Sequence, residues 1–77
     1  MKIRNLITKI PLVELAGDQR ILIENHLGVL SYCPEEIQIK VVYGTLLITG
    51  ESLYFLELSR EQMVINGLID NISLLRR

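Results

Sequence analysis

The chain has 77 residues and a formal net charge of −1 at pH 7, from eight basic and nine acidic residues. This length allows one small domain, and the near-zero charge gives no reason to expect a nucleic-acid partner. Ile, Leu and Val together make up 30 of the 77 residues, whereas Trp is absent and Phe occurs once, so the core is expected to be aliphatic.

A domain this small has a marginal core and commonly depends on a disulfide, a metal ion or a partner subunit. The single cysteine, Cys33, excludes an internal disulfide, and the sequence has no His/Cys cluster that would predict zinc. No cofactor is therefore expected, and the mean hydropathy of +0.35 points to a dense core or to self-association. No signal peptide and no run of about 18 apolar residues is found, so a cytoplasmic location is expected.

Residues 1–11 predict a short N-terminal amphipathic helix, an arm preceding a domain at 12–77. Pro11 would end this helix. Its apolar face would hold Ile3, Leu6, Ile7 and Ile10, with the basic residues Lys2, Arg4 and Lys9 off that face. The basic residues are interpreted first as solubilising charges at a chain end. The alternative is that the arm docks on an anionic membrane surface or on a partner protein.

From Pro11 onward the apolar residues alternate with a period of two, which is typical of strands. Strands are predicted near 12–15, 20–24, 28–32, 36–42, 45–49, 53–58, 62–66 and 68–74. Seven or eight short strands indicate an all-β domain, which is either a small sheet or a β-solenoid-like stack.

Turn-forming residues separate these strands. Those singled out as structural turns are Asn25, His26, Gly28, Gly44, Gly50, Asn66 and Gly67. Asn66-Gly67 is the strongest hairpin signal, because both residues tolerate the positive φ angles of a type I′ turn.

The alternation predicts which side chains face the core. These are Ile21, Ile23, Ile37, Ile39, Val41, Leu46 and Ile48. In contrast, segments 46–48 and 53–56 are apolar on both faces, which predicts that another layer or another subunit covers them. The residues expected at a partner or oligomer interface are Leu47, Leu53, Tyr54 and Leu56.

A weak internal repeat is also present. Residues 46–50 (Leu-Leu-Ile-Thr-Gly) resemble residues 63–67 (Met-Val-Ile-Asn-Gly) after a shift of 17. Such a repeat fits either a solenoid or consecutive hairpins, and the sequence leaves both open.

No catalytic site is predicted. His26 is the only histidine, and in a turn between strands it more often bonds backbone than acts as a base. Cys33 has no basic neighbour that would activate its thiol. A ligand-binding or hydrolytic domain that uses His26 is kept as a third hypothesis.

Four segments in order resemble the YabP/YqfC family of sporulation proteins, with the YqfC branch closer. They are 20–30 (RILIENHLGVL), 36–40 (EIQIK), 44–53 (GTLLITGESL) and 63–69 (MVINGLI). The most specific elements are the turn Ile-Glu-Asn-His-x-Gly at 23–28 and Gly-x-Leu-x-Ile-x-Gly at 44–50.

The resemblance implies a small non-enzymatic protein of the mother cell during endospore formation, associated with a membrane-linked sporulation partner. It supplies no catalytic residues, and it implies that His26 belongs to a structural turn, with a partner contact as the alternative. The expected function is thus an assembly or scaffold module that binds itself or that partner, without nucleic acid or small-molecule substrate. Peripheral binding at the forespore membrane through the N-terminal arm is the alternative.

Overall fold

Alternating aliphatic residues build six antiparallel strands, and the computed structural model describes them within residues 10–77. The strands are β1 (Leu12–Ala16), β2 (Arg20–Glu24), β3 (Val29–Cys33), β4 (Glu36–Val41), β5 (Gly44–Leu58) and β6 (Gln62–Arg76). They form one sheet in the order β1-β2-β6-β5-β4-β3. The all-β prediction is confirmed. The solenoid alternative is wrong, because every neighbouring pair of strands is antiparallel.

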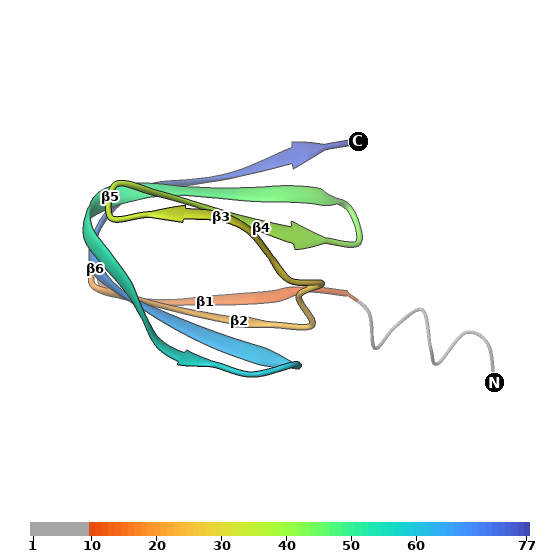
Figure 1. Cartoon of the computed structure of the whole chain (residues 1–77), viewed down its shortest axis with the longest axis horizontal. Coiled ribbons are helices and arrows are strands. Elements are labelled where there is room, and N and C mark those ends of the chain that lie inside the picture. Colours follow the sequence, from red (N-terminus) through yellow and green to blue (C-terminus); the bar gives the residue numbers. More distant parts are fainter. Residues whose placement is uncertain (1–9) are drawn as a thin grey trace, which may run out of the picture.

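The sheet folds over on itself through its two longest strands, β5 and β6, of 15 residues each. Their midpoints bend, and Figure 1 shows two layers joined at that bend. The first layer contains β1, β2, residues 62–66 of β6 and residues 53–58 of β5. The second layer contains β3, β4, residues 44–50 of β5 and residues 68–76 of β6.

The core lies between these layers and is aliphatic apart from one methionine. Its buried residues are Ile21, Ile23, Ile37, Ile39, Val41, Leu46, Ile48, Leu53, Met63 and Ile65. All seven core positions expected from the alternation are among them. No polar or charged side chain of the described residues is buried, so burial of apolar surface between the layers is the main stabilising term.

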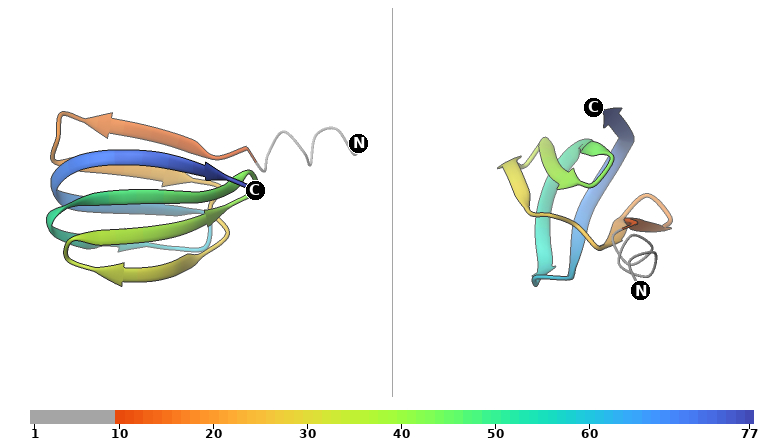
Figure 2. Two further views of the ribbon diagram at one scale, coloured as in Figure 1. Left: turned by 90° about the horizontal axis from the view of Figure 1, so that it is seen from above. Right: turned by 90° about the vertical axis from the view of Figure 1, so that its right-hand side faces the viewer.

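The two layers are related by an approximate twofold symmetry. Ile21 pairs with Ile65 in the first layer, and Ile37 pairs with Ile48 in the second. The turns match as well, because Gly67 donates its N–H to Gln19 O (3.2 Å) and Gly50 donates to Glu35 O (3.0 Å). The two repeated segments of the sequence therefore occupy equivalent places in the fold. The segment in β5 pairs with the β3–β4 hairpin, and the segment in β6 pairs with the β1–β2 hairpin. Figure 2 gives the same layers from two further directions.

Two predicted turns are wrong, and this reduces eight predicted strands to six. Gly50 lies within β5, and Asn66 and Gly67 lie within β6. These glycines serve the bend, where the strands approach too closely for a side chain. A Cβ on Gly50 would lie 2.0 Å from Leu68 O, and one on Gly67 would lie 2.8 Å from Leu53 Cα. Gly44 was expected within a turn, but it is the first residue of β5 and follows the turn at residues 42–43.

The predicted N-terminal helix falls almost entirely on residues 1–9, which lie outside the described residues. Ile10 and Pro11 belong to no helix, and residues 10–77 contain none. The helix is therefore not borne out in the part of the chain that the structure describes. Within that part, no helix is long and apolar enough to cross a membrane.

Candidate functional site: the clasp and the loop end

The loop between β2 and β3, residues 25–28, joins the two layers at the end of the molecule opposite the bend. Asn25 donates its N–H to Glu61 O (2.8 Å), in the turn between β5 and β6. Leu27 donates its N–H to Lys40 O (2.7 Å) on β4, and Lys40 donates back to Gly28 O (2.8 Å). We call this loop and its partners the clasp. Figure 1 shows the loop crossing from one layer to the other.

His26 uses both ring nitrogens within the clasp. Gly28 donates its N–H to Nδ1 (3.0 Å), so in the neutral ring the proton resides on Nε2. Nε2 lies 2.8 Å from Ser59 O and donates to it. The imidazole therefore bridges its own loop to the turn between β5 and β6.

Asn25 and Gly28 allow the backbone of the clasp to turn. Asn25 has φ 63° and Gly28 has φ 123°, and Asn is one of the few non-glycine residues that tolerate the left-handed region. The Asn25 side chain also donates from Nδ2 to Ile10 O (2.9 Å), which fixes the approach to β1. Each named position of the Asn-His-x-Gly motif thus has a structural role.

These contacts remove the geometric support for the hypothesis that His26 binds a ligand or acts in hydrolysis. A general base needs a nitrogen free to take a proton from a substrate, and both nitrogens of His26 are bonded to backbone. Within residues 10–77, no group of three His, Cys, Asp or Glu residues is arranged to hold a metal ion. Cys33 is a free, exposed thiol.

Exposed apolar side chains gather around the clasp, on a surface that we call the loop end. It contains the start of β1, the three loops at 25–28, 42–43 and 59–61, and the end of β6, which Figure 1 shows on one side of the molecule. Arg77 donates its N–H to Tyr43 O (3.2 Å), which places the end of β6 beside the turn at 42–43. The exposed apolar residues here are Ile10, Leu12, Leu27, Val42, Tyr43, Leu58, Leu74 and Leu75.

The charges of the described residues are unevenly distributed between the two ends of the fold. The loop end carries the basic residues Lys40, Arg60, Arg76 and Arg77 together with the acidic residues Glu24 and Glu61. The Arg76 guanidinium lies 5.6 Å from the centre of the Tyr43 ring. The bend carries Asp18, Glu35, Glu51 and Asp70, with one basic residue, Arg20. The loop end is therefore apolar with a small basic excess, whereas the bend has an acidic excess.

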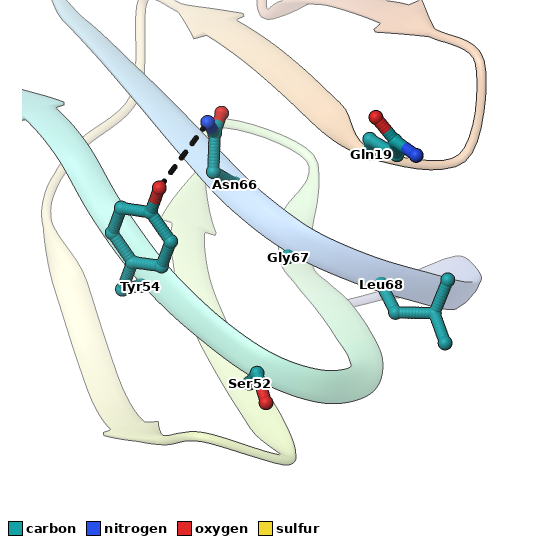
Figure 3. A pocket seen from close by; sticks show the side chains of 6 residues that line it. All are labelled: Gln19, Ser52, Tyr54, Asn66, Gly67 and Leu68. Carbon is teal, nitrogen blue, oxygen red and sulfur yellow. Dashed lines mark hydrogen bonds between the residues drawn. The ribbon is translucent and has the colours of Figure 1, made fainter.

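A shallow depression of about 370 Å³ lies at the bend, lined by six uncharged residues: Gln19, Ser52, Tyr54, Asn66, Gly67 and Leu68 (Figure 3). Asn66 Nδ2 lies 3.4 Å from the Tyr54 hydroxyl, and Arg20 Nε donates to Asn66 Oδ1 (3.1 Å). These groups can offer hydrogen bonds to a ligand. The lining has no carboxylate, imidazole or thiol that would supply acid–base or nucleophilic chemistry.

The four residues expected at an interface do not form one surface. Leu53 is buried in the core, so it cannot contact a partner in the folded state. Leu47 is half-buried in the second layer, where it pairs with Gln38 and Ser73. Tyr54 and Leu56 are exposed on β5 in the first layer.

Of the arm residues expected to dock on a membrane or partner, the structure describes Ile10 alone, and it is 46% exposed. Ile3, Leu6, Ile7, Lys2, Arg4 and Lys9 lie outside the described residues.

The sequence reasoning missed the loop end, although one local signal pointed to it. Val42 and Tyr43 occupy a two-residue turn, where polar residues and glycine are usual. Consecutive apolar residues at such a position are exposed by the geometry of the turn, so the pattern marks a candidate contact surface. Leu27 gives the same signal within the loop at 25–28.

Comparison with known proteins agrees with the resemblance seen in the sequence. The YabP family matches residues 9–77 of the chain. One relative, described as "Uncharacterized protein YqfC" from Bacillus subtilis (strain 168), is 28% identical over 61 residues. The aligned region covers 79% of this chain and 66% of that relative, so the chain spans just under two thirds of the relative's length.

Proposed function

We propose that this chain, which belongs to the YabP family, is an assembly module in endospore formation that binds another protein through its loop end. Family membership is consistent with a role in sporulation. The partner is either a second copy or a membrane-linked sporulation protein of the mother cell. We assign no catalytic step to this chain.

One observation carries this proposal: large apolar side chains are exposed more often than they are buried. Among residues 10–77, fourteen large hydrophobic residues are exposed, and ten hydrophobic residues are buried in the core. Single exposed leucines are common on protein surfaces, but contiguous apolar patches mark interaction sites. Eight of the fourteen lie at the loop end, which makes it the best candidate for a contact surface.

The clasp supports the same proposal because it makes the loop end rigid. Hydrogen bonds from Asn25, His26 and Leu27 fix the loop to both layers before any partner binds. A preformed surface loses less conformational entropy on association than a flexible one. The uneven charge distribution favours one orientation of an anionic partner, because basic residues are in excess at the loop end and acidic residues are in excess at the bend.

The test is capture of partners by the full chain from sporulating cells, with mass spectrometry of the captured proteins. Leu27 and Val42 are each exposed by nearly half, so the double variant Leu27→Ser/Val42→Ser removes apolar area at the loop end with little effect on the core. Leu68→Ser, at the bend, is the matched control. We expect the control to retain a specific partner and the double variant to lose it. Equal capture by both variants would contradict the assignment of the loop end.

A second candidate function is peripheral binding to an anionic membrane, which the basic excess of the loop end favours, with four basic residues against Glu24 and Glu61. Each basic residue near such a surface contributes about 1 kcal/mol, and exposed aliphatic side chains add to this. Sedimentation with vesicles of phosphatidylglycerol and phosphatidylcholine tests it. Binding should fall in the variant Arg76→Gln/Arg77→Gln and with rising salt. Deletion of residues 1–10 tests the contribution of the arm separately.

A further inference from the structure

The second half of β6, residues 68–76, has a free strand edge. On one side these residues pair with β5. On the other side, the described partner is Asp18 O, which accepts the N–H of Ile69 (2.8 Å). From residue 70 to residue 76, no backbone partner on this side is found among residues 10–77. An unpaired edge is a template for another strand.

The other edges of the fold are protected from such pairing. β1 and β3 have five residues each, and the register of β3 is irregular between Val29 and Ser31. The edge of β5 in the first layer is partly occupied by side chains. Leu53 O accepts the Tyr32 hydroxyl (2.7 Å), and Ser59 O, just after β5, accepts His26 Nε2 (2.8 Å). By the approximate twofold symmetry, this is the edge equivalent to the free edge of β6.

The direction of the free backbone groups follows from the end of the strand. Arg77 donates its N–H to Tyr43 O, toward β5. Because consecutive residues of a strand direct their backbone groups to opposite sides, Ile72, Leu74 and Arg76 direct theirs to the free edge. Side chains of the same three residues share one face of the strand, and Ile72 and Leu74 pair with the core residues Ile48 and Leu46.

We infer that a second copy of this chain pairs with this edge, antiparallel and twofold symmetric about Ser73. This inference rests on the proposed function. It specifies how two copies of the chain would associate. In this register Ile72 of one copy opposes Leu74 of the other. Asp70 is the unpaired residue at the irregularity of register between β5 and β6, and it lies beside Arg76 of the other copy. Apolar residues meet apolar residues, and acid meets base, on both sides of the axis.

Neighbouring registers lack this complementarity. An axis at Ile72 would place Asp70 opposite Leu74. An axis at Leu74 would place Ile72 opposite Arg76. The residues along this edge therefore favour the register with its axis at Ser73 over the two neighbouring registers. Because one strand edge is a narrow interface, we expect a dimer that dissociates at about micromolar concentrations.

Engineered cysteines test the register. In a Cys33→Ser background, Ser73→Cys should form a disulfide-linked dimer on mild oxidation, because directly opposed residues lie about 4.5–5.5 Å apart between Cα atoms. Asn71→Cys is the matched control on the same face of the strand. It would lie about 14 Å from its counterpart, four residues along the strand, and should not cross-link with itself.

A mixture gives a second readout in the same background. Asn71 of one copy opposes Leu75 of the other when the axis is at Ser73. Asn71→Cys mixed with Leu75→Cys should therefore form a mixed disulfide-linked dimer, whereas neither variant does so alone. Self-cross-linking of Asn71→Cys, with none of Ser73→Cys, would overturn the register.

Charge exchange tests the pairing without cysteines. Asp70→Lys or Arg76→Glu alone should weaken the dimer about tenfold, measured by sedimentation equilibrium. The double variant Asp70→Lys/Arg76→Glu should restore it, because the opposed charges again differ in sign. Rescue would not follow if either substitution acted by disturbing the fold.

The outcomes separate this inference from the proposed function. If the wild-type chain associates but Ser73→Cys does not cross-link and the charge variants have no effect, the β6 edge is wrong and assembly through another surface stands. If the wild-type chain remains monomeric and Ser73→Cys does not cross-link, self-pairing is wrong. Capture of a membrane-linked partner then decides the proposed function alone.

Discussion

At the residue scale, the clasp shows how one histidine can be structural without being buried. His26 accepts one backbone hydrogen bond and donates another, and these bonds span residues 26–28 and 26–59. The turn was predictable from Asn25, His26 and Gly28, because such residues favour turns. Its partners at Ser59 and Lys40 were not, since they depend on how distant segments meet in the folded sheet.

Loss of the His26 side chain should destabilise the fold by an amount that two partly exposed hydrogen bonds explain. We expect His26→Ala to lower the free energy of unfolding by about 1–2 kcal/mol, measured by urea denaturation. Arg60→Ala is the control, because Arg60 is exposed in the neighbouring turn and should change stability by less than about 0.5 kcal/mol. Equal effects of the two substitutions would mean that the two His26 hydrogen bonds contribute nothing to stability.

Tyr32 allows a hydrogen bond and a ring contact to be separated. Its hydroxyl donates to Leu53 O (2.7 Å), and its ring centre lies 5.5 Å from that of Phe55. Tyr32→Phe keeps the ring contact and should cost about 1 kcal/mol of stability. Tyr32→Leu removes both and should cost about 1 kcal/mol more. A Tyr32→Phe variant as stable as wild type would indicate that water replaces the hydroxyl bond.

The core could be predicted only where polar residues alternate with apolar ones. Ile21 and Ile23 were assigned correctly because Arg20 and Glu24 mark the outer face of that strand. Leu53 is also buried, but residues 53–56 are all apolar and mark no face. Ser52 has φ 55° at an irregularity of register between Glu51 and Tyr54, where the alternation cannot be continued from the sequence.

At the scale of elements, the bends in β5 and β6 could not be predicted from the sequence. Asn66-Gly67 has the chemistry of a hairpin turn, yet both residues lie inside β6. The dipeptide predicts a turn because both residues tolerate positive φ, and Gly67 does have φ 140°. A tight turn and a bend in a long strand both need a glycine, and only tertiary contacts distinguish them.

Gly67 should be essential because of the space it leaves. Gly67→Ala would place its Cβ 2.8 Å from Leu53 Cα and Ser52 O, both backbone atoms that cannot yield cheaply. We expect a loss of more than about 3 kcal/mol, seen as a lower thermal midpoint or failure to fold. Gly17→Ala separates sterics from backbone conformation, because Gly17 also has positive φ but has no atom within 4 Å of its Cβ position. That control should cost about 1 kcal/mol, and similar losses in both variants would show that φ alone requires glycine at 67.

At the scale of the whole molecule, β5 and β6 make the two layers one cooperative unit. Each strand runs through both layers, so neither layer has a complete set of strands without the other. Both layers also share one core, which likewise makes them a single cooperative unit. The repeat in the sequence suggested two units but not how they meet, because the bend and the clasp join segments that are far apart in the chain.

The approximate symmetry predicts matched effects of matched substitutions. Ile21 and Ile37 are both fully buried, and they pair with Ile65 and Ile48, which occupy equivalent places in the two layers. Ile21→Val and Ile37→Val should each lower the free energy of unfolding by about 1 kcal/mol. Urea unfolding followed by circular dichroism should remain a single transition of unchanged slope, because both layers unfold together. Two transitions, with each substitution shifting a different one, would show that the layers unfold separately and that the bent strands do not couple them.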